Sequence, residues 1–139
     1  MTQEIVLRGR GVFPGVAQGQ ALVTRMPISG FGGINPLTGT ITERRHELVG
    51  QTFKDRILVF PGAKGSSGWA SNFQATRLAG SAPKAMVFCK ISTKIALGVV
   101  VMRVPAVTDL QTDPFELIRT GDQVCVDGDR GLVIIRRVS

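Results

Sequence analysis

The residues best suited to chemistry lie together in one short loop that follows an apolar run at 57–60. They are Lys64, Gly65, Ser66 and Ser67. A serine hydroxyl is a weak base, but a nearby ammonium and the free amides of a helix start stabilise its alkoxide and attract anions. The loop is not a P-loop, because Lys64 precedes Gly65 instead of following it. The pattern therefore indicates either an anion-binding loop or an ordinary glycine-serine turn.

The segments around this loop predict a strand, a loop and a helix. Four successive apolar residues at 57–60 are typical of a strand covered on both faces, and Pro61 cannot donate to a strand ladder. We expect a helix from about Ser67 to Ala79 and a second strand at 85–89. Together they make a strand-helix-strand unit, which should be parallel and right-handed.

The rest of the chain predicts mainly strands. They are expected at 4–8, 16–23, 38–42, 104–107, 123–126 and 132–138, with the last two forming a hairpin. Residues 18–20 suggest a bulge or bend, and the long loop at 27–39 is of a length that is usually functional or disordered. The apolar segment 92–102 fits a helix or a strand, and its length favours a helix. Asp113 is expected to cap a short helical turn at 114–118.

Length and composition predict one domain over residues 1–139, large enough for its own core. Seventeen Lys and Arg against ten Asp and Glu give a net charge of +7, which favours a small anionic substrate or an acidic partner. Aromatic content is only 6% and basic residues are scattered, so we do not expect nucleic-acid binding. We also expect no membrane span and no signal peptide, and hence a cytoplasmic protein.

Residues that could bind a metal are few in this sequence. Cys89 and Cys125 lie far apart, and we interpret both as buried thiols in a reducing compartment. His46 is the only histidine, so we do not expect a metal site within the chain. The charged segment 43–48 is interpreted as a solvated turn, with Arg45 or His46 as alternative anion-binding residues.

A series of motifs runs through nearly the whole chain in one order. It comprises Gly9-Arg10-Gly11, Pro14-Gly15-Val16-Ala17, Ile28-Ser29, Gly32-Gly33, Leu58-Val59-Phe60-Pro61, Lys64-Gly65-Ser66-Ser67, Ala82-Pro83-Lys84-Ala85 and Asp127-Gly128-Asp129-Arg130-Gly131. In this order the chain resembles the small, swivel-domain subunit of aconitase X. The resemblance implies a β-rich α/β fold, the swivelling β/β/α barrel, which docks on a large subunit. It also implies a dehydratase whose iron or iron-sulfur centre lies on the large subunit, with no cofactor on this chain, which alone should be inactive.

The same resemblance assigns roles within the loop. Ser66 matches the serine that the aconitase superfamily uses as proton acceptor, and Ser67 would orient the substrate. The remaining residues expected to bind substrate are Gly65, Lys64, Gly32, Gly33 and Arg45. One departure matters: aconitases proper follow the two serines with an arginine that binds a carboxylate, whereas this chain has Gly68. The substrate therefore cannot be inferred from aconitase itself.

Two anionic substrates occur within the resembling family. We expect cis-3-hydroxy-L-proline, because the segments around Trp69 and at 102–109 resemble bacterial members more than archaeal ones, and 5-phosphomevalonate is the alternative. An alternative of another class is a swivel module without enzymatic activity, such as a phosphohistidine carrier built on His46. For the dehydratase, we expect the docking face to include the loop near Phe31 and the helix start near Trp69.

Overall fold

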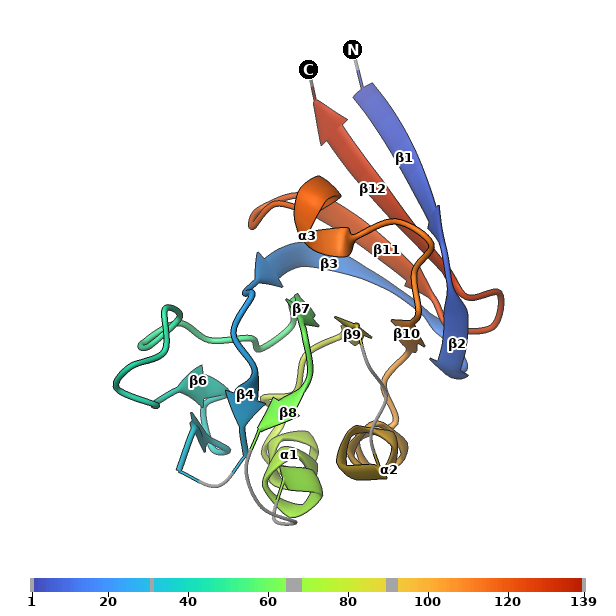
Figure 1. The fold of residues 1–139 in the computed structure, drawn as a ribbon. Coiled ribbons are helices and arrows are strands. Elements are labelled where there is room, and N and C mark those ends of the chain that lie inside the picture. The colour runs from blue at the N-terminus through green and yellow to red at the C-terminus, as the bar shows by residue number, and fades with distance from the viewer. Residues whose placement is uncertain (1, 31, 65–68, 90–92, 139) are drawn as a thin grey trace.

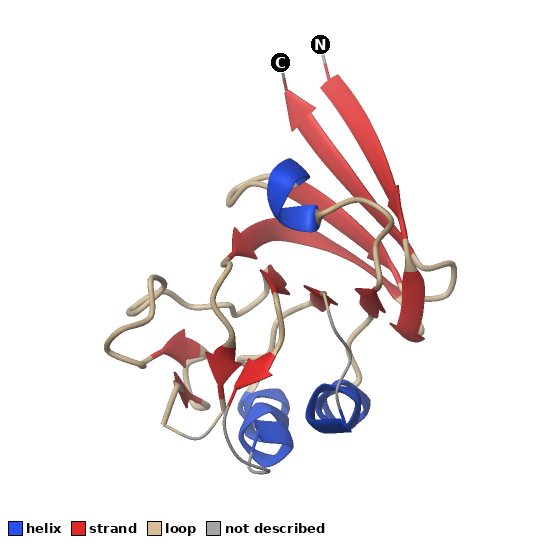
Figure 2. Cartoon of the chain, viewed as in Figure 1, coloured by secondary structure: helices blue, strands red, loops and turns tan. Residues whose placement is uncertain are grey.

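The computed structural model describes residues 2–30, 32–64, 69–89 and 93–138, and its main feature is a large curved sheet with two helices on one side (Figures 1 and 2). The first strands are β1 (Thr2–Arg8), β2 (Arg10–Phe13), β3 (Val16–Val23), β4 (Ile28–Ser29), β5 (Ile34–Asn35), β6 (Thr40–Ile41), β7 (Ile57–Phe60) and β8 (Ala63–Lys64). The remaining elements are α1 (Trp69–Ala79), β9 (Ala85–Phe88), α2 (Thr93–Met102), β10 (Ala106–Thr108), α3 (Pro114–Leu117), β11 (Gln123–Asp127) and β12 (Leu132–Val138).

The large sheet closes through the first strands of the chain. Its order is β1-β12-β11-β3-β7-β9-β10-β2, so the two edge strands are consecutive in sequence and separated only by Gly9. Strands β3, β7, β9 and β10 are parallel, and the other neighbours are antiparallel. β1 and β2 thus connect the two ends of the sheet as one bent strand, which agrees with the strand-rich α/β barrel that the family resemblance implied.

The predicted strand-helix-strand unit is confirmed. β7 is buried at all four positions and runs parallel to β9, with Ile57 opposite Ala85. Helix α1 connects them, and α2 then leads to β10, so both helices cover the parallel strands from the same side (Figure 1). The apolar segment 92–102 is therefore a helix over its described residues, as its length favoured.

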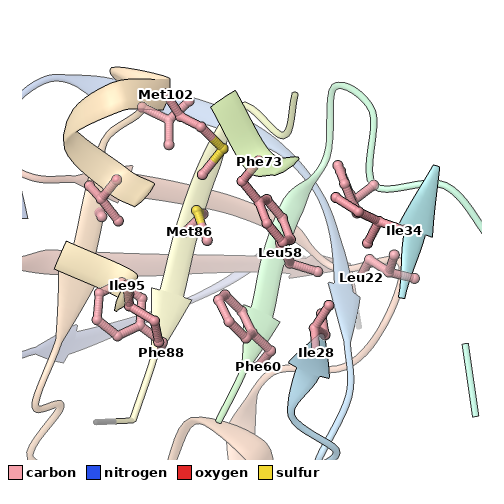
Figure 3. Close-up of a cluster of buried hydrophobic side chains, with 14 of the residues drawn as sticks. Leu22, Ile28, Ile34, Leu58, Phe60, Phe73, Met86, Phe88, Ile95 and Met102 are labelled. Atoms are coloured by element: carbon pink, nitrogen blue, oxygen red, sulfur yellow. The ribbon is translucent and has the colours of Figure 1, made fainter. Parts of the chain in front are cut away.

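Two apolar clusters hold the layers together. The larger lies between the helices and the parallel strands and includes Leu58, Phe60, Phe73 and Ile95 (Figure 3). Its largest fully buried side chain is that of Trp69, whose ring stacks on Phe73 with centroids 4.1 Å apart. The second cluster packs the parallel strands against the antiparallel hairpin, and its fully buried members include Ile57, Val87, Val124 and Ile135. The structure is thus a three-layer arrangement of sheet, sheet and helices.

Several details differ from the sequence-based predictions. Residues 10–13, expected to connect two strands, form β2 and pair with β10. Residues 18–20 do not bulge, because Gln18 and Gln20 keep an unbroken register with β11. Cys89 and Cys125 are half-buried and not fully buried, and neither forms a disulfide. The cap of α3 is confirmed, since Phe115 N donates to Asp113 Oδ1 at 2.9 Å.

One ion pair joins the C-terminal hairpin to the turn before it. Arg137 Nε and Nη2 donate to the two carboxylate oxygens of Asp122 at 3.2 and 2.6 Å, and Nη2 also donates to Leu117 O at 2.6 Å. Burial by itself raises the pKa of Asp122, but the hydrogen bonds from Arg137 and from Arg119 N outweigh it and leave that pKa below its ordinary value. The charged form of Asp122 is therefore favoured in the folded chain.

Candidate functional site

The candidate site lies where parallel strands end and helices begin. β7 leads through β8 to α1, so the predicted loop follows the carboxyl end of a parallel strand. Residues 65–68, which include the predicted Gly65, Ser66 and Ser67, lie outside the described residues. The structure therefore defines this loop by its two ends, Lys64 and Trp69.

Both ends of the loop are held by the segment 28–30. β4 pairs in parallel with β8, which places Ser29 opposite Lys64. On the other side, Trp69 Nε1 donates to Ile28 O at 2.9 Å. Gly30 lies so close to the helix start that an added Cβ would be 2.6 Å from Trp69 Cα. Residues 28–30 thus fix the separation between the end of β8 and the beginning of α1.

A turn at 42–47 brings the predicted glycines and lysine together. Thr42 N donates to Gly33 O at 2.9 Å, and Thr42 Oγ1 donates to Gly32 O at 3.3 Å. The next residue, Glu43, accepts a hydrogen bond from Lys64 Nζ through Oε1. Gly32, Gly33 and Lys64 therefore meet at this turn, which also carries the exposed Arg45.

The ion pair changes the interpretation of Lys64 as a free cation for an anion. Its side chain is 46% exposed, whereas that of Glu43 is 25% exposed. An anion can approach the ammonium from solvent, but it must compete with a carboxylate that already binds it. Glu43 was not predicted, because a glutamate in a charged segment is usually solvated. The only indication of this ion pair in the sequence was that Glu43 and Lys64 carry opposite charges.

His46, the alternative anion-binding residue, is buried in the same turn and only 2% exposed. Leu48 N donates to its Nδ1 at 3.1 Å. Glu47 fastens the turn to the end of β3, because its Oε1 accepts from Thr24 Oγ1 and from Arg25 N. The segment 43–48 is thus a packed turn in which His46 cannot meet a phosphoryl donor, contrary to the carrier hypothesis.

The described residues do not fit an iron-sulfur centre or another bound metal. Among residues 2–30, 32–64, 69–89 and 93–138, no group of three or more His, Cys, Asp or Glu side chains could hold a metal ion. Clusters of the expected kind need several thiolates at one place.

Within the same described ranges, no helix is long and apolar enough to cross a membrane.

The docking prediction is only partly compatible with the structure. Trp69 is fully buried and is covered by its own chain, so it cannot be an apolar contact for a partner in this conformation. Phe31 lies outside the described residues. The loop at 28–30 and the start of α1 do lie together, as expected for one rim.

The fold and this arrangement define a swivel domain of the aconitase type, and sequence comparison agrees. The model of the family described as the aconitase X swivel domain matches residues 6–135. The chain belongs to this family. The resemblance seen in the sequence is therefore confirmed, and with it the role of a subunit of an aconitase X-type dehydratase.

Individual relatives are more specific. The phosphomevalonate dehydratase small subunit of Methanosarcina mazei is 34% identical over 93% of this chain and 90% of its own length. The protein of the same name from Archaeoglobus fulgidus is 41% identical over 89% of this chain and 93% of its own. Among solved structures, Thermococcus kodakaraensis aconitase X in its holo-form has a TM-score of 0.89 and 34% identity, and covers 94% of this chain and 98% of its own.

Proposed function

We propose that this chain is the small subunit of a phosphomevalonate dehydratase. The observation that carries the proposal is that relatives of this name align with almost the whole chain and with almost their whole length. This substrate replaces cis-3-hydroxy-L-proline. That substrate was favoured only because two short segments, around Trp69 and at 102–109, resemble bacterial members of the family. A phosphorylated substrate also suits the net charge of +7.

In this proposal the chain supplies proton transfer and part of the anion binding. Ser66 takes a proton from the carbon adjacent to the one that bears the departing hydroxyl, so that a double bond forms between the two carbons, and Ser67 orients the substrate. Lys64 attracts an anionic group, with the backbone at Gly32 and Gly33 and the side chain of Arg45 at the same turn. The hydrogen bond between Trp69 Nε1 and Ile28 O supports the role of the serine loop, because it holds in place the residue that follows this loop. The large subunit would hold the iron centre, which would assist the departure of hydroxide.

The proposal requires a partner, and the experiment is designed accordingly. The chain is co-expressed with the aconitase X-type large chain of the same genome, and the purified pair is incubated with 5-phosphomevalonate or with cis-3-hydroxy-L-proline. We expect the loss of one water from 5-phosphomevalonate, measured by mass spectrometry, and none with either chain alone. Turnover of cis-3-hydroxy-L-proline with 5-phosphomevalonate unchanged would contradict the assignment of substrate.

The role of Ser66 is tested in the same assay. Ser66→Ala should lower kcat by roughly 10²- to 10⁴-fold, as expected for the loss of a general base, while assembly with the large subunit is retained. Ser71→Ala is the matched control, since Ser71 is an exposed residue of α1 and should leave turnover unchanged. If Ser66→Ala keeps more than about a tenth of wild-type turnover, the base lies elsewhere.

A further inference from the structure

Two buried polar atoms in the turn at 42–47 have no hydrogen-bond partner among the described residues. They are Glu43 Oε2 and His46 Nε2. Buried polar atoms are nearly always paired, because an unpaired one loses its hydration without compensation. Both atoms belong to one turn, which His46 N closes by donating to Glu43 O at 3.1 Å. The two orphan atoms therefore need a common explanation.

The two atoms are chemically complementary. Because His46 Nδ1 accepts a hydrogen bond from Leu48 N, the ring is neutral and its proton lies on Nε2. His46 thus presents a buried N–H donor, whereas Glu43 presents a carboxylate oxygen. The Cα atoms of the first and fourth residues of such a turn lie within about 7 Å, so a rotated glutamate can reach the ring. Each atom is the partner that the other lacks.

Lys64 holds the Glu43 carboxylate in the position in which its Oε2 makes no hydrogen bond to His46. Its ammonium binds Glu43 Oε1, and a hydrogen bond between two charged groups is stronger than one from a neutral imidazole N–H. Since the Lys64 side chain is 46% exposed, an anion from solvent can take over the ammonium. Once Lys64 is neutralised by that anion, the buried N–H of His46 becomes the better partner for Glu43.

We propose that Glu43 and His46 are positioning residues for Lys64: the Glu43 carboxylate holds the ammonium in the absence of an anion and moves to His46 Nε2–H when an anion binds. This inference rests on the proposed role of Lys64 as an anion contact. It adds a defined resting position for the lysine and a second position for the glutamate. No covalent bond changes, and the proton stays on His46 Nε2.

The test uses NMR on the full chain labelled with ¹⁵N-histidine, and inorganic phosphate is the probe. His46 is the only histidine, so its ring signals need no assignment among several. We expect phosphate to shift the Nε2 proton downfield and to slow its exchange with water in a saturable way. Nδ1 should remain an unprotonated acceptor throughout.

Three variants separate the parts of the proposal. Lys64→Met frees the glutamate, so the His46 signals should resemble the phosphate-bound form without phosphate and should no longer respond to it. Glu43→Gln removes the competing charge, so phosphate should bind up to about fivefold more tightly, the gain expected from losing an exposed ion pair. Glu4→Gln is the matched control, because it also removes the acidic partner of an exposed ion pair, with Arg136, but on β1. It should change neither quantity.

The proposal is overturned if Lys64→Met leaves the His46 signals as in the wild type, or if Glu43→Gln does not tighten phosphate binding. The first result decides the question whatever the affinity for phosphate, since it needs no ligand. Failure here is distinguishable from failure of the proposed function. The dehydratase assay measures product formed by the two-chain enzyme, whereas this experiment measures one side chain in the small subunit.

Discussion

Gly30→Ala tests the central geometric claim, namely that residues 28–30 fix the start of α1. An added Cβ would lie 2.6 Å from Trp69 Cα and 3.1 Å from Trp69 O, and both are backbone atoms that cannot rotate away. Ordinary contact begins at 3.4 Å, so the two segments must separate by 3.4 − 2.6 = 0.8 Å. A shift of that size along the Trp69 Nε1 to Ile28 O direction would lengthen the 2.9 Å hydrogen bond beyond its useful range.

The expected loss of stability combines the clash, the lost hydrogen bond and the effect of glycine on the unfolded chain. Overpacking costs about 1–3 kcal/mol, and the lost hydrogen bond adds about 1 kcal/mol. Replacing glycine recovers about 0.4–1 kcal/mol through the unfolded chain. We therefore expect a net loss of about 1–3 kcal/mol, or roughly 3–12 °C in Tm for a chain of this size. Turnover of the two-chain enzyme should fall further than stability alone explains, because the end of the serine loop moves.

Trp69 is the only tryptophan, so its fluorescence reports directly on this contact. We expect a red-shifted emission in Gly30→Ala, together with a lower denaturation midpoint. Gly80→Ala is the control: Gly80 has φ +76° with no atom within 4 Å of an added Cβ, so it costs backbone strain of about 1–2 kcal/mol without a clash. It should keep wild-type emission and turnover. Unchanged emission, stability and turnover in Gly30→Ala would show that residues 28–30 do not fix the start of α1.

Two further predictions concern stability. Asp122→Asn should destabilise the chain by about 1–3 kcal/mol at neutral pH. Because the folded-state pKa of Asp122 is lowered, this difference from wild type should shrink as pH falls through that pKa. Urea unfolding at several pH values measures the difference. A gap that stays constant into acid would contradict the ion pair with Arg137. Gly98→Ala would place a Cβ 2.2 Å from the Trp69 ring, so denaturant unfolding should show a cost of about 1–3 kcal/mol, partly offset by about 1 kcal/mol of helix propensity. Leu97→Ala, on the exposed side of the same helix, should cost less.

The sequence predicted those elements whose residues carry a local signal. The run at 57–60 is apolar at every position because β7 is covered on both sides, and the C-terminal hairpin alternates around a glycine-containing turn. β2 was missed because Gly11 and Pro14 indicate a turn, and its pairing with β10 depends on a strand far along the chain. Strands of two residues, such as β4 and β8, are too short to show any periodicity.

The candidate site rests on the sequence only in part. The serine loop and Lys64 were predicted from their residue types and from family motifs, and Gly32 and Gly33 from motifs alone. The pairing of Glu43 with Lys64 could not be predicted, because it depends on β4 and β8 bringing separate segments together. The burial of His46 follows from the same tertiary packing, which a charged local sequence conceals.

The closure of the sheet by β1 and β2 has a consequence for how the chain folds. In the large sheet β1 pairs with β12, with Thr2 opposite Val138, so its partner is synthesised after all the other strands of that sheet. Pairing across such a sequence separation is slow, because a very long loop must close before any contact forms. Until then the nascent chain keeps the hydrogen-bonding edges of β1 and β11 open, and such edges readily join other chains. Closure of the barrel should therefore be the late step of folding, and the interval before it should be when the chain most needs a chaperone.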